Sequence, residues 1–319
     1  MKGVLRGVIL WLGLLVLPVK AAAAELIPVG QVIGLQLYHD RVTVAAYDDI
    51  LGGTARNAGL KIGDQILEID GKTVACAEDV RGALQSSQGQ ITLTVSRAGK
   101  ERQLRLSPAN TEDGPKMGVF LRQGIGGIGT VTFYDPASGT FGALGHGVWD
   151  SEGLLKMTRG NAFEATVAEI KKGKAGDPGQ LRGTAESPIP FAPLLKNTPQ
   201  GVFGVSPHRW QGEAFATADY ESVHTGTASI RTQIGTDQPR EYSVEILKIY
   251  PETRPDHRNF LLRVTDPDLL RATGGIVQGM SGSPILQDGK LIGAVTHVLV
   301  NDPTTGYGIF IDNMLDAAG

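Results

Sequence analysis

The 319-residue chain has a single cysteine, Cys76, so it cannot form an intramolecular disulfide and must fold on its hydrophobic core. No Cys/His cluster has the spacing of a zinc site, and the HExxH and P-loop patterns are absent. The 30 Lys and Arg residues do not exceed the 33 Asp and Glu residues, so no basic surplus is available to neutralise phosphates. These absences predict a protein without a metal or other cofactor and without a nucleic-acid partner.

Long apolar runs are also scarce, apart from one near the N-terminus. Lys2 and Arg6 precede an apolar run at positions 8–17, and small residues follow at positions 21–24, which is the layout of a signal peptide. The run is short for a spanning helix, which needs about 20 apolar residues, but the alanines could extend it. We therefore expect residues 1–25 to be a signal peptide or a signal anchor, and the protein to be exported.

Aromatic residues make up only 6% of the chain, whereas glycine is abundant at 43 residues. This composition favours a turn-rich, mainly β fold over a helical bundle. Alternating strand patterns and one amphipathic helical segment indicate a first domain over residues 26–107. A Pro-, Gly- and charge-containing stretch at 108–116 predicts a linker. Many short strands with frequent turns over 117–319 indicate a sandwich or a barrel.

The first domain carries the pattern AxxAGLxxGDxILxIDG, from Ala55 to Gly71. This stretch closely resembles PDZ domains, which implies an α+β, partly open barrel that binds extended peptides by strand addition. The resemblance places the carboxylate-binding loop on the segment IGLQL, with the backbone N–H groups of Gly34 and Leu35 as donors. A PDZ domain that only packs on its neighbour, or spaces it from a membrane, is the alternative.

The stretch GMSGSPIL, Gly279 to Leu286, raises the possibility of a serine nucleophile at Ser281. Such a serine needs a histidine base, an acid and backbone donors for the oxyanion. The N–H groups of Gly279 and Ser281 could be these donors, since glycine permits the unusual backbone angles. The stretch resembles the GDSGGP motif of chymotrypsin-like proteases, although Met280 replaces the aspartate and Ser283 a glycine. An ordinary Gly/Ser turn is the alternative.

Six histidines compete for the role of the base, and His146 stands out among them. In the segment FGALGHGVWD it ends an apolar strand and has glycine on each side, which exposes the ring and leaves room for a substrate. Its alternative is a strand-end histidine bonded to the backbone. His297, in GAVTHVLV, is the rival, either as a core histidine or as part of a cleft wall.

The segments ALGHGV, VTDPDLL and GGIVQGMSGSPILQDGKLIGAVTHVLV, behind a PDZ block, resemble the SpoIVB peptidase family of endospore-forming bacteria. The resemblance implies a chymotrypsin-like double β-barrel over 117–319 and a catalytic triad of His146, Asp266 and Ser281, with no cofactor. Asp266 is the weakest of the three, because Asp-Pro at a helix start is also a common N-cap.

Family resemblance also implies a biological role. Peptidases of this type act in the space between the forespore and mother-cell membranes, where they cleave a membrane-bound regulator of SpoIVFA type. That cut starts the processing of a sigma-factor precursor. The resemblance further implies self-cleavage, expected within residues 21–30, and recognition of the enzyme's own N-terminal segment by the PDZ domain. An HtrA-like quality-control protease and a PDZ-led, non-catalytic adaptor are the alternatives.

Overall fold

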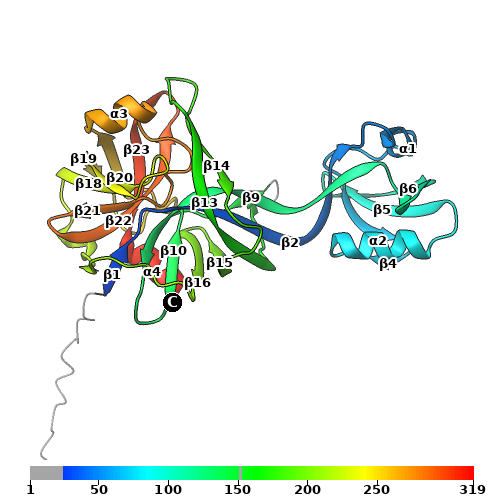
Figure 1. Ribbon diagram of the computed structural model, residues 1–319, viewed down its shortest axis with the longest axis horizontal. Coiled ribbons are helices and arrows are strands. Elements are labelled where there is room, and N and C mark those ends of the chain that lie inside the picture. Colours follow the sequence, from blue (N-terminus) through cyan, green and yellow to red (C-terminus); the bar gives the residue numbers. More distant parts are fainter. Residues whose placement is uncertain (1–23, 151–152) are drawn as a thin grey trace, which may run out of the picture.

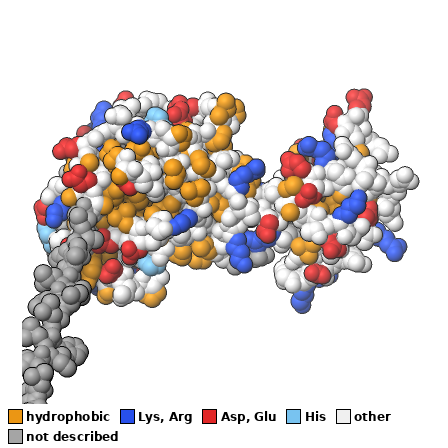
Figure 2. All heavy atoms as spheres, turned by 90° about the horizontal axis from the view of Figure 1, so that it is seen from below, with side chains coloured by type: hydrophobic (Ala, Val, Ile, Leu, Met, Phe, Trp, Pro, Cys, Tyr) orange, Lys and Arg blue, Asp and Glu red, His pale blue; other side chains and the backbone are white. Residues whose placement is uncertain are grey.

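The computed structural model describes residues 24–150 and 153–319, which form two lobes joined by a pair of long strands (Figure 1). The two strands are β2 (Val32–Tyr47) and β9 (Val119–Tyr134), which pair antiparallel. Each strand contributes one end to the large lobe and the other end to the small lobe. Hydrophobic surface gathers on the large lobe in the face that Figure 2 shows, while charged side chains are scattered over the small lobe.

The small lobe is a sheet covered by two helices. Val42 and Val44 of β2 pack in its core with Leu60, Ile66 and Leu84. The alternation of apolar residues along the strands buries one face of the sheet. Helix α2 (Ala77–Ser86) covers that face with its own apolar side. Its remaining elements are α1 (Gly52–Asn57), β3 (Gln65–Ile69), β4 (Lys72–Thr73), α2 (Ala77–Ser86), β5 (Ile91–Arg97) and β6 (Lys100–Leu106).

The large lobe contains two barrels. In the first, six strands pair in the order β9, β10, β16, β15, β13 and β2, and the pairing of β2 with β9 closes the ring. Strand β1 pairs with the last two residues of β9, and β14 pairs with β13. The strands not yet bounded are β1 (Glu25–Pro28), β10 (Thr140–Ala143), β13 (Arg159–Lys171), β14 (Gln180–Ala185), β15 (Ala192–Thr198) and β16 (Gly201–Val205).

The second barrel is closed by six strands in the order β18, β19, β20, β23, β22 and β21. Phe260 and Phe310 meet edge to face in its core, with ring centroids 4.6 Å apart. The strands are β18 (Gly226–Thr232), β19 (Arg240–Ile249), β20 (Phe260–Val264), β21 (Pro284–Gln287), β22 (Lys290–Leu299) and β23 (Asp302–Phe310). Helices α3 (Pro267–Thr273) and α4 (Ile311–Ala318) complete the lobe. The mainly β, double-barrel prediction is therefore confirmed.

Short elements connect the larger ones. They are β7 (Ala109–Thr111), β8 (Gly114–Lys116), β11 (Trp149–Asp150), β12 (Gly153–Leu154), β17 (Phe215–Ala216) and the 3₁₀ turn η1 (Tyr220–Ser222). The expected linker at 108–116 is thus not bare chain, because β7 and β8 pair as a hairpin within it.

The expected domain boundary at residue 26 differs from the structure. Residues 25–37 belong to the large lobe, where Ile33, Leu35 and Leu37 pack against Val131. The small lobe is therefore inserted between the first half of β2 and the second half of β9. Alternation along a strand shows which side chains face a core, but it does not show which core, because β2 passes through both lobes without a break.

The predicted signal segment falls almost wholly on residues 1–23, which lie outside the described residues. From residue 24 onward, and leaving out 151–152, no helix is long and apolar enough to cross a bilayer.

Candidate active site

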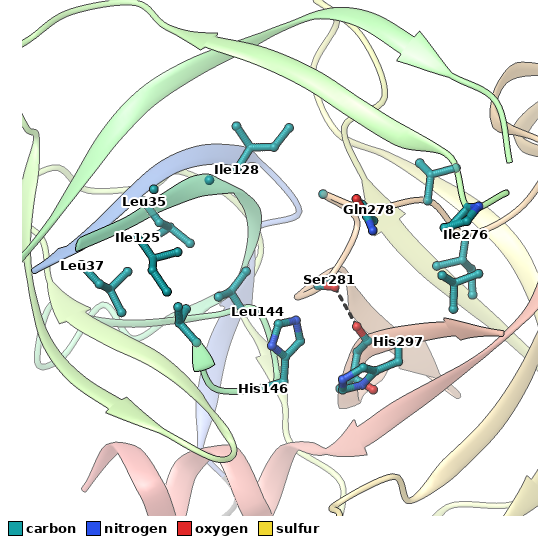
Figure 3. A pocket seen from close by; sticks show the side chains of 18 of the residues that line it. Leu35, Leu37, Ile125, Ile128, Leu144, His146, Ile276, Gln278, Ser281 and His297 are labelled. Carbon is teal, nitrogen blue, oxygen red and sulfur yellow. Dashed lines mark hydrogen bonds between the residues drawn. The ribbon is translucent and has the colours of Figure 1, made fainter. Parts of the chain in front are cut away.

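Ser281, His146 and His297 line one cleft of about 450 Å³ between the two barrels (Figure 3). Ser281 lies on the loop before β21, His146 follows β10, and His297 is on β22. The structure thus brings together the predicted nucleophile and the predicted base, which are far apart in the sequence. His297 forms part of the cleft wall, as one of its two interpretations had it.

The nucleophile loop is anchored to the first barrel by two buried threonines of β9. The Thr130 hydroxyl donates to the Gly279 carbonyl over 2.8 Å, and the Thr132 hydroxyl donates to the Gly282 carbonyl over 2.7 Å. The Thr130 amide also donates to the Ser281 carbonyl at 2.9 Å. Gly282 has φ +96°, and a Cβ there would lie 2.0 Å from the Thr130 carbonyl oxygen. This approach requires glycine, both for the backbone angle and for the space.

The two amides that we expect to form an oxyanion hole are unpaired. Among the described residues, neither the Gly279 nor the Ser281 N–H group donates a hydrogen bond, whereas the flanking amides do. Met280 N–H donates to the Val277 carbonyl, and Gly282 N–H donates to the Val295 carbonyl. Unpaired donors beside a candidate nucleophile are what stabilisation of a tetrahedral oxyanion requires.

His146 is held by its own loop. Its Nδ1 lies 2.9 Å from the Gly147 carbonyl oxygen, which can only accept, so Nδ1 carries the proton and Nε2 is left as the acceptor. Burial lowers the pKa of His146 below its ordinary value, and the positive charge of Arg258 lowers it further, which keeps the ring neutral at pH 7. Leu144, two residues before His146, has φ +71°, a strained angle for a non-glycine residue, and such strain concentrates at functional sites.

In this structure the Ser281 hydroxyl donates to the Thr296 carbonyl at 2.7 Å, so it is not directed at His146 (Figure 3). Rotation about its Cα–Cβ bond is needed before His146 can accept the proton. Such loose geometry is common in active sites without a substrate. The His297 ring lies beside that of His146, with centroids 5.0 Å apart. Burial, followed by the His146 and Arg258 charges, lowers the pKa of His297 to about 4.

The structure does not place Asp266 beside His146. Its carboxylate caps α3, where Oδ1 accepts from the Asp268 amide at 2.9 Å and from the Leu269 amide at 3.0 Å. Oδ2 accepts from the Ser243 amide at 3.4 Å, and Asp266 does not line the cleft. The triad assignment of Asp266 is therefore corrected to the N-cap alternative. The reason is local, since Asp-Pro begins a helix and the carboxylate satisfies that helix's free amides.

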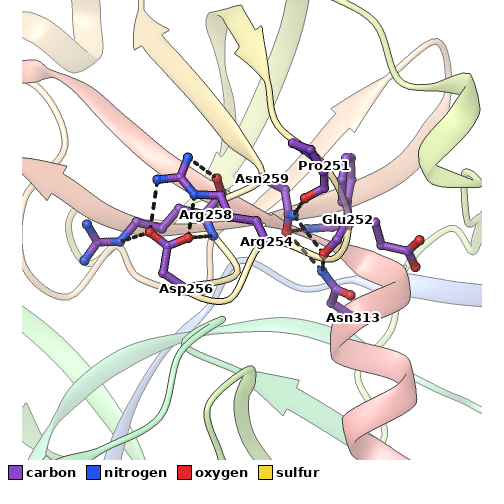
Figure 4. Close-up of polar contacts among 8 residues, drawn as sticks. Pro251, Glu252, Arg254, Asp256, Arg258, Asn259 and Asn313 are labelled. Carbon is purple, nitrogen blue, oxygen red and sulfur yellow. Dashed lines mark hydrogen bonds and ion pairs between the residues drawn. The ribbon is translucent and has the colours of Figure 1, made fainter.

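Asp256 is one of the other aspartates that lie between His146 and Ser281 in the sequence, and its charge reaches His297. It lies on the loop between β19 and β20, and its negative charge raises the pKa of His297, against the larger effects that lower it. Two arginines engage its carboxylate, with Arg254 Nε at 2.6 Å and the Arg258 backbone amide at 3.2 Å (Figure 4). The motif gave no signal for it, because only the folded loop brings it near β22.

The same loop is fixed to the C-terminal helix. Asn259 Nδ2 donates to the Pro251 carbonyl at 2.9 Å, and Asn313 of α4 donates to Asn259 Oδ1 at 3.0 Å (Figure 4). The loop that carries Asp256 is therefore tied down at both its first residues and its last.

Gly34 and Leu35 do not form a peptide-binding loop. They lie in the part of β2 that crosses the large lobe, paired with Phe163 and Ala162 on one side and with β9 on the other. Their position within the sheet, between two strands, corrects the PDZ assignment. Leu35 instead lines the cleft that holds Ser281 and His146. In the small lobe the start of β9 pairs with β2 at the edge of the sheet, and Phe120 there is 57% exposed.

Comparisons with known proteins agree with this arrangement. The model of the SpoIVB peptidase S55 family matches residues 113–315, and a PDZ-domain model matches residues 50–97. The chain belongs to the SpoIVB peptidase S55 family. It is accordingly a serine peptidase that carries a PDZ domain, the small lobe described above.

Curated relatives match smaller parts. A putative zinc metalloprotease of Agrobacterium fabrum is 44% identical over 27% of this chain and 22% of its own length. One of Vibrio cholerae is 33% identical over 40% of this chain and 27% of its own length. The chain thus spans about a quarter of each. Within residues 24–150 and 153–319, no group of His, Cys, Asp and Glu could hold a metal ion.

Solved structures show similarities of low score. The Rv3671c protease from M. tuberculosis, in its active form, has a TM-score of 0.36 at 15% identity, covering 62% of this chain and 75% of that one. The HtrA-type protease AlgW with a decapeptide has a TM-score of 0.38 at 11% identity, and the match covers 90% of this chain and 62% of that one.

Proposed function

We propose that this protein is a serine endopeptidase in which Ser281 is the nucleophile and His146 the general base. One observation carries the proposal: a serine, a neutral histidine with a free Nε2 and two unpaired amides meet in a single cleft. Each of these groups has a distinct role in acyl transfer, and none of them is needed for a structural turn.

The reaction follows from these positions. After rotation of the hydroxyl, Ser281 Oγ attacks the peptide carbonyl carbon while its proton passes to His146 Nε2. The Gly279 and Ser281 amides stabilise the resulting oxyanion. The peptide C–N bond then breaks, and the proton moves from His146 to the leaving amine nitrogen. Water attacks the acyl-enzyme with His146 again as base, which releases the acid and restores the serine.

The orientation of His146 is supplied by the backbone in this mechanism. A triad carboxylate normally fixes the tautomer of the base by accepting from Nδ1–H. Here the Gly147 carbonyl accepts that hydrogen bond at 2.9 Å. A carbonyl dipole stabilises the imidazolium less than a full negative charge would, so this arrangement favours a slow peptidase over a rapid one.

The substrate that family membership suggests is a membrane-bound regulator of SpoIVFA type. We propose that the protein is exported into the space between the forespore and mother-cell membranes, held there by its N-terminal segment or released from it. Cleavage of the regulator would allow processing of a sigma-factor precursor. The family model match over residues 113–315 supports this role.

Self-cleavage and binding of the protein's own N-terminal segment by the PDZ domain belong to the same proposal. Residues 25–28 form β1, in which Leu26 is 2% exposed, so a cut there would require the strand to leave the sheet. We therefore place self-cleavage before Glu25, in the first part of the expected range at 21–30.

Labelling of residues 25–319 with a fluorophosphonate tests the activity. We expect the wild type and the control Ser222→Ala, at an exposed serine in η1, to be labelled, while Ser281→Ala and His146→Ala are not. A folded wild type that is not labelled would sink the proposal. Incubation with the extracytoplasmic part of a SpoIVFA-type regulator, beside unfolded casein, then separates one defined cut from HtrA-like degradation.

A further inference from the structure

Among the described residues that line the catalytic cleft, none has an acidic or basic side chain other than histidine. Its polar lining consists of His146, His297, Gln278, Ser281 and Thr296, and the rest is aliphatic side chains, a proline and glycine backbone. Both histidines have a pKa below 6.5 because of burial, so they are neutral at pH 7. A charged substrate side chain that entered the cleft would lose its hydration without gaining a partner of opposite charge.

The apolar lining comes from two sides of the catalytic residues (Figure 3). On one side lie Leu35 and Leu37 of β2 with Ile125 and Ile128 of β9. On the other side lie the segments 276–278 and 296–298 of the second barrel. A cleft of about 450 Å³ is within the usual range for ligand sites, roughly 300–1,000 Å³, so it has room for more than one side chain.

The second-barrel side lies next to the reacting centre. Residues 276–278 directly precede the oxyanion amide of Gly279, and the Thr296 carbonyl holds the Ser281 hydroxyl at 2.7 Å. In the residue that supplies the scissile carbonyl, the side chain is attached to the Cα next to the attacked carbonyl carbon. It therefore lies close to these two segments when the carbonyl is at Ser281. Val277 and Val298 are the aliphatic residues it would contact there.

We propose that the cleft selects peptides with a large aliphatic or aromatic side chain on the residue that supplies the scissile carbonyl. This inference rests on the proposed function and names its substrate class. The wall formed by β2 and β9 accommodates a second apolar side chain of the substrate. In an apolar site each missing methylene lowers kcat/KM by about 10-fold or more, so alanine at this position is a poor substitute for leucine.

The test uses phosphonate diphenyl esters, which form a bond between Ser281 Oγ and phosphorus as phenol leaves. They carry a leucine, phenylalanine, alanine, lysine or glutamate side chain at the position next to phosphorus. A fluorophosphonate without a recognition group is the activity control. We expect the leucine and phenylalanine compounds to label at least about 10-fold faster than the alanine compound, and faster still than the charged ones.

A matched pair of variants isolates the effect of charge. Val298 is half-buried at the cleft, and Val298→Asp and Val298→Asn introduce side chains of the same shape, of which only the aspartate is charged. We expect the ratio of the labelling rate with the lysine compound to that with the leucine compound to rise above the wild-type ratio in Val298→Asp and not in Val298→Asn. The labelling rates of each variant by the lysine and leucine compounds are divided by that variant's own rate with the fluorophosphonate, so that a general loss of reactivity cancels in the comparison.

The outcomes separate the two proposals. If the fluorophosphonate labels the wild type but the lysine or glutamate compound reacts as fast as the leucine compound, the apolar selectivity is wrong and the peptidase assignment stands. An equal response of the Val298→Asp and Val298→Asn variants to the lysine compound would also overturn it. If the folded protein is not labelled by the fluorophosphonate, the proposed function fails, and this inference fails with it.

Discussion

Replacement of Asp266 discriminates between a capping residue and a catalytic acid. In the structure its carboxylate accepts from three backbone amides, those of Asp268, Leu269 and Ser243. Asp266→Ala therefore removes an N-cap, which costs about 1 kcal/mol of stability. For a domain of this size, such a loss lowers Tm by roughly 2–4 °C and leaves the protein folded at 25 °C. We expect the rate of fluorophosphonate labelling at 25 °C to be nearly unchanged.

A triad acid would give a different result. Loss of the carboxylate from a Ser-His-Asp triad lowers kcat by about 10⁴-fold, without any need for a change in Tm. Asp266→Ser sharpens the contrast, because serine is an effective N-cap but has no carboxylate. Its Tm and labelling rate should both stay near those of the wild type, and Asp268→Ala on the same helix turn is the control for charge. A labelling rate reduced by orders of magnitude in folded Asp266→Ser would refute the reasoning.

Two further changes act on the loop and on the histidine pair. Gly282→Ala should abolish labelling and destabilise the fold, because its Cβ would lie 2.0 Å from the Thr130 carbonyl oxygen. The control is Gly289→Ala, at φ +72°, where a Cβ would have no atom within 4 Å and the cost is backbone strain alone. Equal effects of the two substitutions on Tm would contradict this. The pKa of His297 in the folded state is about 4, below its ordinary value of 6.5. The neutral ring therefore makes its full contribution to the free energy of unfolding above pH 6.5. As the pH falls towards 4 that free energy decreases, by at most about 3 kcal/mol. His297→Phe should therefore flatten the dependence of unfolding free energy on pH in that range, and an unchanged curve from urea denaturation would refute it.

Short-range sequence patterns were enough to predict much of the site. Residues 279–282 contain the proposed nucleophile and both amides of the proposed oxyanion hole within four positions, so the geometry of one glycine-rich turn places them together. His146 stands out in the sequence because glycine on each side, at the end of an apolar strand, exposes the ring and leaves room for a substrate. The pairing of these two segments is long-range, and its anchors, Thr130 and Thr132, carry no signal in the sequence.

The errors also have physical causes. Asp266 precedes a proline and a helix, and that local arrangement is equally compatible with a cap and with a catalytic acid. Only the fold shows that its carboxylate is already occupied by amides. The resemblance to PDZ domains places the carboxylate-binding loop at Gly34 and Leu35, but the first half of β2, which carries both residues, belongs to the other lobe.

The insertion of the PDZ domain leads to a last prediction about folding. Tyr38 of β2 lies opposite Gly124 of β9, and the pairing of the two strands becomes irregular beyond them, so a two-residue Asn-Gly turn between Tyr38 and Gly124 can replace residues 39–123. The buried clusters of the large lobe contain no residue from the excised segment, whose own core is separate.

We therefore expect the excised protein to unfold cooperatively and to be labelled by the fluorophosphonate. Its Tm should be somewhat reduced, because the ion pair of Arg41 with Asp150 at 2.5 Å is lost. Circular dichroism on heating and the labelling assay measure the two properties independently. A protein that folds but is not labelled would mean that the PDZ domain holds the β2–β9 pair, and with it Thr130 and the nucleophile loop, in the reactive position. An excised protein that does not fold would contradict the separation of the two cores.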